Sequence, residues 1–201
     1  MTADDVALLA RWRAGDSAAG ETLTRSTFPL VFRFFDTKVP TQALDLSQQT
    51  FLALVEGRGR AEIRSSFRAY VLGIARHVLI AHLRHHYRAG FEPAEVSVLE
   101  ALPDPATTPT SRVYAQQQRA HVVQALQKLA LDHQVALEMH YWNELSIAEI
   151  ADVLDCTPGS IKARLFRARK ALQTAVAAMR EGEEPAIGVL EDALSSVAPK
   201  G

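Results

Sequence analysis

Apolar residues recur at spacings of three and four along nearly the whole of this chain, and the alternating pattern of a β-strand is absent. This spacing places apolar side chains on one side of an α-helix, where they can be buried together. A long helix is predicted on these grounds from Ser65 or Ser66 to about Arg88. Its predicted buried stripe comprises Phe67, Tyr70, Val71, Ile74, Val78 and Ala81. The pattern as a whole predicts an all-α fold.

Helix-start and helix-stop residues mark shorter helices before this one. A helix over 4–14 is predicted to end at Gly15. Asp16 is predicted to cap the next helix, because an Asp side chain accepts hydrogen bonds from the first free backbone N–H groups. That second helix is expected to continue past Pro29, either straight or with a kink. A third helix is predicted over 40–56.

Residues 89–110 differ in character from the rest of the chain, because proline, threonine and acidic residues replace the helical pattern. Proline cannot continue a helix and favours an extended path, so this stretch is predicted to be a linker. It separates an N-terminal helical domain over 1–88 from a smaller helical domain over 111–180, and an acidic tail follows over 181–201. The prolines of the linker are Pro93, Pro103, Pro105 and Pro109.

Cationic residues are concentrated in two segments of a chain whose formal net charge is −1. Residues 58–88 contain seven arginines and one acid, and residues 158–170 contain five Lys or Arg and no acid. Two such segments suggest two separate contacts with a polyanion, although Arg-rich helices are also found as ordinary solvated surfaces. Charge alone does not decide between these interpretations.

The segment LSIAEIADVLDCTPGSIKARLFRARKAL, residues 145–172, has the pattern of a helix-turn-helix. Ser146 and Glu149 form the S-x-x-E capping box that marks a helix start. After a turn, Thr157 and Pro158 suit the cap and the first position of a second helix. A short capped helix, a tight turn and a second helix with a cationic side are typical of DNA-binding domains.

The second helix of this pair is predicted to place its outer face in the major groove. The residues predicted to be buried in one narrow arc are Ile161, Leu165, Ala168 and Leu172. Lys162 and Arg167 are expected to reach base edges, and the other cations to contact phosphates. A plain helical hairpin with a basic face is the alternative, but an exposed Phe166 gains nothing from solvent. The full set predicted to bind DNA is Ser160, Lys162, Ala163, Arg164, Phe166, Arg167, Arg169 and Lys170.

Three segments resemble conserved blocks of the bacterial sigma-70 family. LDLSQQTFLALVEG, residues 44–57, resembles the helix by which sigma factors dock onto the polymerase clamp. FRAYVLGIARHVLIAHLRHHYR, residues 67–88, resembles the basic aromatic helix used on the promoter −10 element. SIKARLFRARKAL, residues 160–172, resembles the block that reads the −35 element. Two domains with these blocks in this order resemble the extracytoplasmic-function (ECF) group of the family.

The resemblance implies residues for two further sites. The polymerase-binding set is Asp45, Gln48, Gln49 and Phe51. The set for the −10 region is Arg58, Arg60, Arg64, Phe67, Arg68, Tyr70, Arg76, His77 and Arg84, with the loop over 57–66 forming a base pocket. Core packing at helical spacing is the favoured interpretation for Phe67 and Tyr70, so the arginines are the stronger candidates in this set.

The resemblance also implies the partners: core RNA polymerase, through the clamp region of its largest subunits, promoter DNA, and an anti-sigma factor. The alternative is a one-component regulator whose N-terminal domain senses a ligand or dimerises. Exposure of the polar residues of the docking helix favours the first interpretation, because a ligand-sensing domain would line a cavity there. The polar residues expected to be exposed are Asp45, Ser47, Gln48 and Gln49.

Sequence patterns of enzyme active sites are missing, since no Gly-rich phosphate loop, catalytic triad pattern or H-E-x-x-H occurs. No catalytic residue, small-molecule substrate or cofactor is predicted. His82, His85 and His86 share one side of a helix, but no carboxylate or Cys lies near to complete a metal shell. Arg84 and Arg88 would also repel a cation, so no metal site is predicted.

The sequence also leads to an expectation about where the protein resides and how it ends. The N-terminus has early acids and no cleavage-site pattern, Cys156 is the single cysteine, and no apolar run approaches ~20 residues. A cytoplasmic protein without membrane insertion is expected. The tail is expected either to form one short amphipathic helix through Leu190 and Leu194 or to have no stable structure. A tail folded back on a cationic surface would lower activity.

Overall fold

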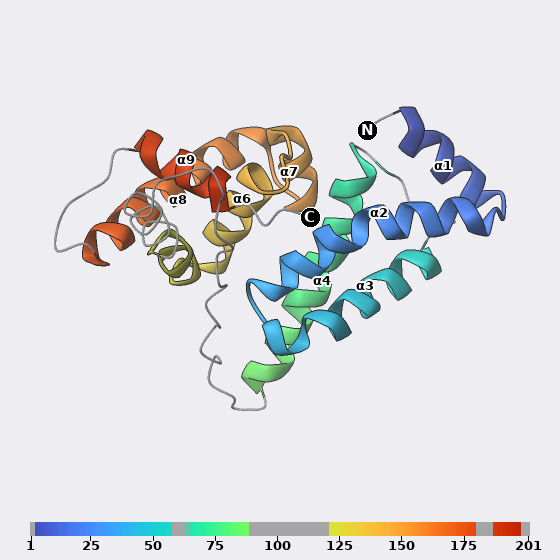
Figure 1. The fold of residues 1–201 in the computed structure, drawn as a ribbon, viewed down its shortest axis with the longest axis horizontal. Coiled ribbons are helices and arrows are strands. Elements are labelled where there is room, and N and C mark those ends of the chain that lie inside the picture. The colour runs from blue at the N-terminus through green and yellow to red at the C-terminus, as the bar shows by residue number, and fades with distance from the viewer. Residues whose placement is uncertain (1–2, 58–62, 64, 89–120, 180–186, 198–201) are drawn as a thin grey trace, which may run out of the picture. The chain divides into compact units, whose positions relative to one another are not determined.

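The computed structural model describes residues 3–57, 63, 65–88, 121–179 and 187–197. All regular secondary structure within these residues is helical (Figure 1), as the apolar spacing predicted. The helices are α1 (Ala3–Arg13), α2 (Ser17–Asp36), a 3-10 turn (Pro40–Gln42), α3 (Ala43–Gly57), α4 (Phe67–Arg88), α6 (Leu131–Tyr141), α7 (Ile147–Val153), α8 (Pro158–Met179) and α9 (Ile187–Val197). Residues 121–127 are helical as well.

The chain divides into two compact units. The first holds α1 to α4, and residues 148–156 are grouped with it; the second holds α6, α8 and α9. Within the first unit, α2 packs against α1, α3 and α4, and α3 packs against α4 (Figure 1). Large side chains that are almost fully buried form the core of this unit: Leu23, Phe35, Leu54, Phe67, Leu72 and Leu79.

Asp16 caps α2 as predicted, and α2 continues through Pro29. The Asp16 carboxylate accepts hydrogen bonds from the backbone N–H groups of Ala18 and Ala19, at 3.0 and 3.2 Å. The Arg11 guanidinium lies 2.7 Å from the same carboxylate. The hydrogen bond from Arg11 and those from the helix start hold the pKa of Asp16 below its usual value.

The buried side of α4 differs from the predicted stripe, apart from Phe67 and Val71. Tyr70, Ile74 and Val78 are only half-buried and Ala81 is exposed. The side chains that are buried instead are Ala69, Leu72, Ala75 and Leu79. At 100° per residue, the centre of the buried side is rotated by roughly a quarter turn from the predicted one. The prediction failed because apolar residues cover much of the helix circumference, and packing against α2 and α3 selects which of them are buried.

In the second unit, α6 packs against α8, and α9 packs against both. Leu190 and Leu194 of α9 are 3% and 1% exposed, so the tail forms the amphipathic helix that was one of the two predicted alternatives. None of the described helices is both long enough and apolar enough to cross a membrane.

Candidate nucleic-acid and polymerase interfaces

Local hydrogen bonds shape the turn between α7 and α8. The backbone N–H of Cys156 donates to the carbonyl of Ala151 at 3.0 Å, and Asp155 adopts a positive φ of 49°. The Thr157 hydroxyl then accepts a hydrogen bond from the N–H of Ser160 at 3.2 Å. With Pro158 as its first residue, α8 begins where the cap and proline predicted.

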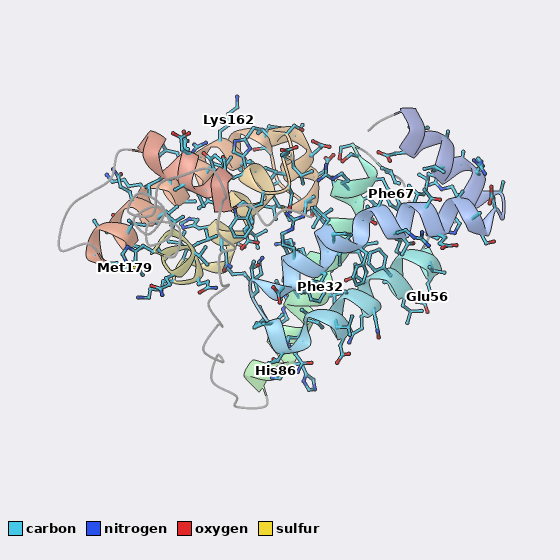
Figure 2. The ribbon with its side chains drawn as sticks, in the orientation of Figure 1. Phe32, Glu56, Phe67, His86, Lys162 and Met179 are labelled. Carbon is cyan, nitrogen blue, oxygen red and sulfur yellow. The ribbon has the colours of Figure 1, made fainter. Side chains whose placement is uncertain are left out.

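The buried arc predicted for α8 is confirmed, because Ile161, Leu165, Ala168 and Leu172 are at most 1% exposed. The outer face therefore points to solvent. The predicted DNA-binding residues that are exposed there are Ser160, Lys162, Ala163, Phe166, Arg167 and Lys170. Figure 2 shows Lys162 extending away from the domain. Phe166 is 64% exposed. Exposure of this ring to water is unfavourable, whereas contact with the groove of a binding partner would bury it.

The two remaining predicted DNA-binding arginines lie beside the outer face and are engaged within the protein. Arg164 lies 3.9 Å from the carboxylate of Asp132, and its side chain is 22% exposed. Arg169 lies 2.7 Å from the carboxylate of Glu191 and donates a hydrogen bond to the hydroxyl of Tyr141 at 2.8 Å. Neither partner was predicted from the pattern of α8, because both belong to other helices.

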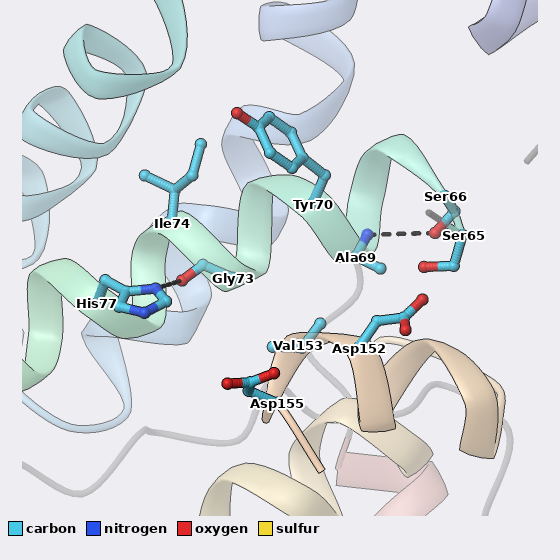
Figure 3. Close-up of a pocket in the computed structure, with 10 residues that line it drawn as sticks. All are labelled: Ser65, Ser66, Ala69, Tyr70, Gly73, Ile74, His77, Asp152, Val153 and Asp155. Carbon is cyan, nitrogen blue, oxygen red and sulfur yellow. Dashed lines mark hydrogen bonds between the residues drawn. The ribbon is translucent and has the colours of Figure 1, made fainter. Parts of the chain in front are cut away.

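On α4, the corrected rotation changes which residues share the solvent side. Tyr70, His77 and Arg84 recur every seven residues opposite the buried side; His77 and Arg84 are exposed and Tyr70 is half-buried. The His77 Nδ1 lies 2.8 Å from the carbonyl oxygen of Gly73 (Figure 3), which fixes the ring beside the helix. We call these three residues the α4 row.

The other residues predicted for the −10 region have different surroundings. Phe67 is 1% exposed, so it belongs to the core rather than to a DNA-facing surface, in line with the interpretation favoured from the sequence. Arg68 is exposed and Arg76 half-buried. Three further arginines lie outside the described residues: Arg58, Arg60 and Arg64.

The predicted polymerase-docking residues lie on the solvent side of α3. Asp45, Gln48 and Gln49 are exposed, as expected. Ser47 is fully buried and its hydroxyl donates to the carbonyl of Ala43 at 2.7 Å, so the prediction of its exposure was wrong. Ser47 is next in sequence to residues on the exposed side of α3. Its hydroxyl can nevertheless be buried, because the helix backbone accepts its hydrogen bond.

Exposed apolar side chains lie beside these polar residues on α3, and they were not predicted from the sequence. Leu44, Leu52 and Val55 of α3 are 53%, 60% and 40% exposed. Phe51, half-buried, stacks on Phe28 of α2 with ring centroids 5.9 Å apart. The spacing of Leu44, Leu52 and Val55, by eight and then three residues, indicates a second apolar stripe on this helix. Clustered exposed apolar side chains mark interaction sites more often than single ones do. We call the outer side of α3, with Phe28, the α3 surface.

The histidines near the end of α4 lie close together. The ring centroids of His82 and His86 are 4.3 Å apart, and those of His85 and His86 are 6.2 Å apart (His86 is labelled in Figure 2). Burial, and then the neighbouring His86 and His85, lower the pKa of His82. Among the described residues, no group of three or more His, Cys, Asp or Glu is placed to hold a metal ion.

The sequence matches two family models. "Sigma-70 region 2" matches residues 24–89, which contain most of α2 and all of α3 and α4. "Sigma-70, region 4" matches residues 119–172, which contain α6, α7 and most of α8. Neither match includes α9.

Named relatives and solved structures are similar over most of the chain. The ECF RNA polymerase sigma factor SigC of Mycobacterium tuberculosis is 31% identical over 159 residues, covering 79% of this chain and 83% of the relative. The RNA polymerase sigma factor CarQ of Myxococcus xanthus is 30% identical over 166 residues, covering 81% and 92%.

Two solved structures have a similar fold. One is the sigma factor RpoE in complex with the anti-sigma factor NepR from Bartonella quintana, with a TM-score of 0.61, 21% identity, and coverage of 78% of this chain and 95% of that one. The other is CnrH in complex with the cytosolic domain of CnrY, with a TM-score of 0.63, 20% identity, and coverage of 87% and 98%.

Proposed function

The chain belongs to the sigma-70 family of RNA polymerase sigma factors, in its ECF group, and from this premise we propose that it binds core RNA polymerase and directs promoter-specific initiation of transcription. The observation that carries the proposal is the presence of both conserved regions in one chain, each with an exposed cationic helix. Promoter selection needs such surfaces and no bond-making chemistry, so we assign no catalytic residue or cofactor. Because such a protein acts with polymerase at promoters, we assign it to the cytoplasm, and to the nucleoid when it is active.

The proposed division of labour follows the two matches. Residues 1–88 form the domain that binds core polymerase and the −10 element, and residues 111–180 form the domain that binds the −35 element. Residues 89–110 link them, and 181–201 form a C-terminal tail. The matches over 24–89 and 119–172 fall inside these two domains, which supports this assignment.

The outer face of α8 is proposed to read the −35 element. Lys162 and Arg167 are exposed and can donate hydrogen bonds to acceptors on base edges, of which guanine offers the best bidentate match to Arg. Phe166 supplies an apolar contact for a thymine methyl group. Lys170 is exposed on the same face and is assigned to a phosphate, as is Arg164, whose 3.9 Å contact with Asp132 is weak.

The α4 row is proposed to meet the −10 element. We assign Tyr70 to stacking on an unpaired base, because aromatic rings bind bases without regard to sequence. His77 and Arg84 extend this proposed DNA-binding surface along the unpaired DNA strand. Arg68 and Arg76 of α4 are assigned to the exposed DNA strand and its phosphates, as are Arg58, Arg60 and Arg64, which lie outside the described residues.

The α3 surface is proposed to dock on the clamp region of core polymerase. Polar side chains at Asp45, Gln48 and Gln49 beside exposed Leu52 give the mixture of apolar centre and polar rim found at protein interfaces. An anti-sigma factor is the second proposed protein partner. Its support is that the sigma factor RpoE, which has a similar fold, was solved in complex with the anti-sigma factor NepR, and that CnrH was solved in complex with the cytosolic domain of CnrY.

The experiment that tests the function combines purified protein with core polymerase from the native host. Transcription is assayed from a library of random promoters at fixed salt. We expect protein-dependent transcripts that share two upstream motifs. The alternative outcome is that native core polymerase neither binds the protein nor initiates with it, while the protein alone binds a specific DNA duplex. That outcome would support the one-component regulator instead.

A matched pair of variants tests the docking surface in the same assay. Asp45→Asn, combined with Leu52→Asp, should weaken binding to core polymerase without unfolding the protein, because both side chains are exposed. Glu21→Gln is the control, since it also neutralises an exposed carboxylate but lies on α2, where Glu21 pairs with Arg25. Equal binding of the two variants to core polymerase would remove the α3 surface from the proposal.

A further inference from the structure

Helix α9 is attached to the second unit by buried and polar contacts. Leu190 and Leu194 are buried, and the Trp142 indole N–H donates to the backbone carbonyl of Leu194 at 2.9 Å. Trp142 itself is 6% exposed. This helix lies beyond residue 172, where the match to sigma region 4 ends, so it is an addition to that region in this chain.

The polar contacts of the Glu191 side chain converge on one arginine of α8. The Arg169 Nε lies 2.7 Å from the Glu191 carboxylate and 2.8 Å from the Tyr141 hydroxyl. The Tyr141 hydroxyl donates to the same carboxylate at 2.6 Å, which closes the triangle. The guanidinium also lies over the Tyr141 ring, 5.7 Å from its centroid. Burial and the bond to Glu191 raise the pKa of Tyr141 above its usual value.

Arg169 would otherwise be placed to contact DNA. It follows Lys162 by seven residues on α8, so the two side chains project from nearly the same side of the helix. Lys162 is exposed, whereas the Arg169 side chain is 25% exposed. Arg169, in contrast to Lys162, is held by Glu191 of α9 together with Tyr141 of α6.

We propose that α9 gates Arg169: while Glu191 holds the guanidinium, the helix-turn-helix lacks one phosphate contact, and release of α9 makes that contact available. The inference rests on the proposed DNA-binding role of α8. A DNA phosphate and the Glu191 carboxylate offer the same kind of acceptor to Arg169, so they compete for it.

The contact is weak enough to be exchanged. The side chains of Arg169 and Glu191 are 25% and 37% exposed, so water and salt screen their attraction. The helix that carries Glu191 has 11 residues, fewer than the ~12–15 at which an isolated helix becomes even marginally stable. It therefore depends on its contacts with α6 and α8, and loss of the Arg169 contact weakens its hold.

The test compares two amide substitutions on α9 in the full chain. Glu191→Gln removes the charge that holds Arg169, whereas Asp192→Asn removes an equal charge from an exposed neighbour. Binding to a random-sequence DNA duplex is measured over a series of salt concentrations. Each phosphate contact adds ~0.9 to the slope of log affinity against log salt, so Glu191→Gln should have a slope steeper than Asp192→Asn by about that amount. At ~0.15 M salt this corresponds to roughly fivefold tighter binding.

A second pair of variants identifies the group that is released. In an Arg169→Gln background, Glu191→Gln and Asp192→Asn should bind DNA alike, because no guanidinium is left to release. Equal slopes for the two single variants would overturn the proposal, and so would a difference that persists without Arg169. Hydrogen exchange over 187–197 should be faster in Glu191→Gln than in Asp192→Asn, because α9 has lost its contact with Arg169, and equal exchange would also contradict the proposal.

The outcome is separable from that of the proposed function. The same variants are assembled with native core polymerase on a promoter selected by the transcription assay, and the same difference in slope is expected. If core polymerase does not initiate with the protein but the duplex results hold, the sigma function fails while the gate stands. If initiation occurs and the slopes agree, the gate fails alone.

Discussion

The two proposed DNA-facing helices, α4 and α8, both have 22 residues and a cationic side. The sequence predicted the buried side correctly for α8 but not for α4. On α8 the predicted buried arc is the observed one, so the outer face followed from it directly. On α4 the buried side is rotated by roughly a quarter turn, and the α4 row emerged only in the structure.

The difference reflects how apolar residues are distributed around each helix. Over residues 158–172 of α8, the side chains outside the buried arc are mostly charged or small, so a single rotation of the helix buries the apolar ones. On α4, Leu72 and Leu79 lie on one side and Ile74 and Val78 on another, so several rotations are nearly as apolar. A wide apolar surface leaves the choice to tertiary packing, here against α2 and α3.

The largest expected effect tests the rotation of α4. Leu79→Ala should destabilise the protein by roughly 2–5 kcal/mol, because Leu79 is 0% exposed and its removal leaves a cavity. Ile74→Ala removes the same number of carbons from a half-buried site and should cost about 1 kcal/mol or less. Urea unfolding followed by Trp12 fluorescence in a Trp142→Phe background measures both. A larger cost at Ile74 would restore the stripe predicted from the sequence.

In the rest of the molecule, contacts within one helix start were predicted from the sequence, whereas contacts that depend on packing were not. Caps at Asp16 and Thr157 are local, because donor and acceptor lie within three residues, and both were predicted. Folding of the tail back on a cationic surface was one hypothesis from the sequence, but the pairing of Arg169 with Glu191 was not predicted, because Glu191 lies on another helix. Burial of Ser47 was missed because a hydroxyl that bonds its own helix can enter a core.

A change on α8 tests whether its outer face reads bases. Arg167→Ala should weaken holoenzyme binding by about 1–3 kcal/mol, and only at promoters that carry the preferred base at one upstream position. Stability should be unaffected because Arg167 is exposed. Lys170→Ala is the control, with a loss that is uniform across promoter sequences and a salt slope smaller by ~0.9. Affinity measured on a set of single-base promoter variants distinguishes the two, and a uniform loss for Arg167→Ala would assign it to a phosphate.

The corresponding test on α4 concerns base stacking by Tyr70. Tyr70→Ala should weaken holoenzyme binding to a single-stranded oligonucleotide that carries the downstream promoter element by about 1–3 kcal/mol. Tyr70→Phe keeps the ring and should bind almost as the wild type does. Because Tyr70 is half-buried, unfolding of each variant is measured alongside. If Tyr70→Ala lowers stability but leaves oligonucleotide binding unchanged, Tyr70 belongs to the core and the α4 row begins at His77.

The smallest effect compares the caps of the two helices, which use the same chemistry in different surroundings. The Ser66 hydroxyl accepts from the N–H of Ala69, and the Thr157 hydroxyl from that of Ser160, both at 3.2 Å (Figure 3 shows the first). Replacing either cap with Ala should cost about 0.5–2 kcal/mol. Ser66 is 4% exposed and Thr157 is exposed. Loss at Ser66 should therefore fall near the upper end, because water cannot reach the freed N–H, and loss at Thr157 near the lower end.

Glycine at each cap separates loss of the hydrogen bond from strain in the backbone, since a Gly cap costs only a few tenths of a kcal/mol relative to Ser or Thr. Urea unfolding of the Ala and Gly variants measures the difference at each helix. Equal Ala costs at the two sites would mean that the start of α4 opens to water as readily as that of α8. The rotation of α4 would then have to be set by the side chains of α2 and α3 alone, without help from the way the helix begins.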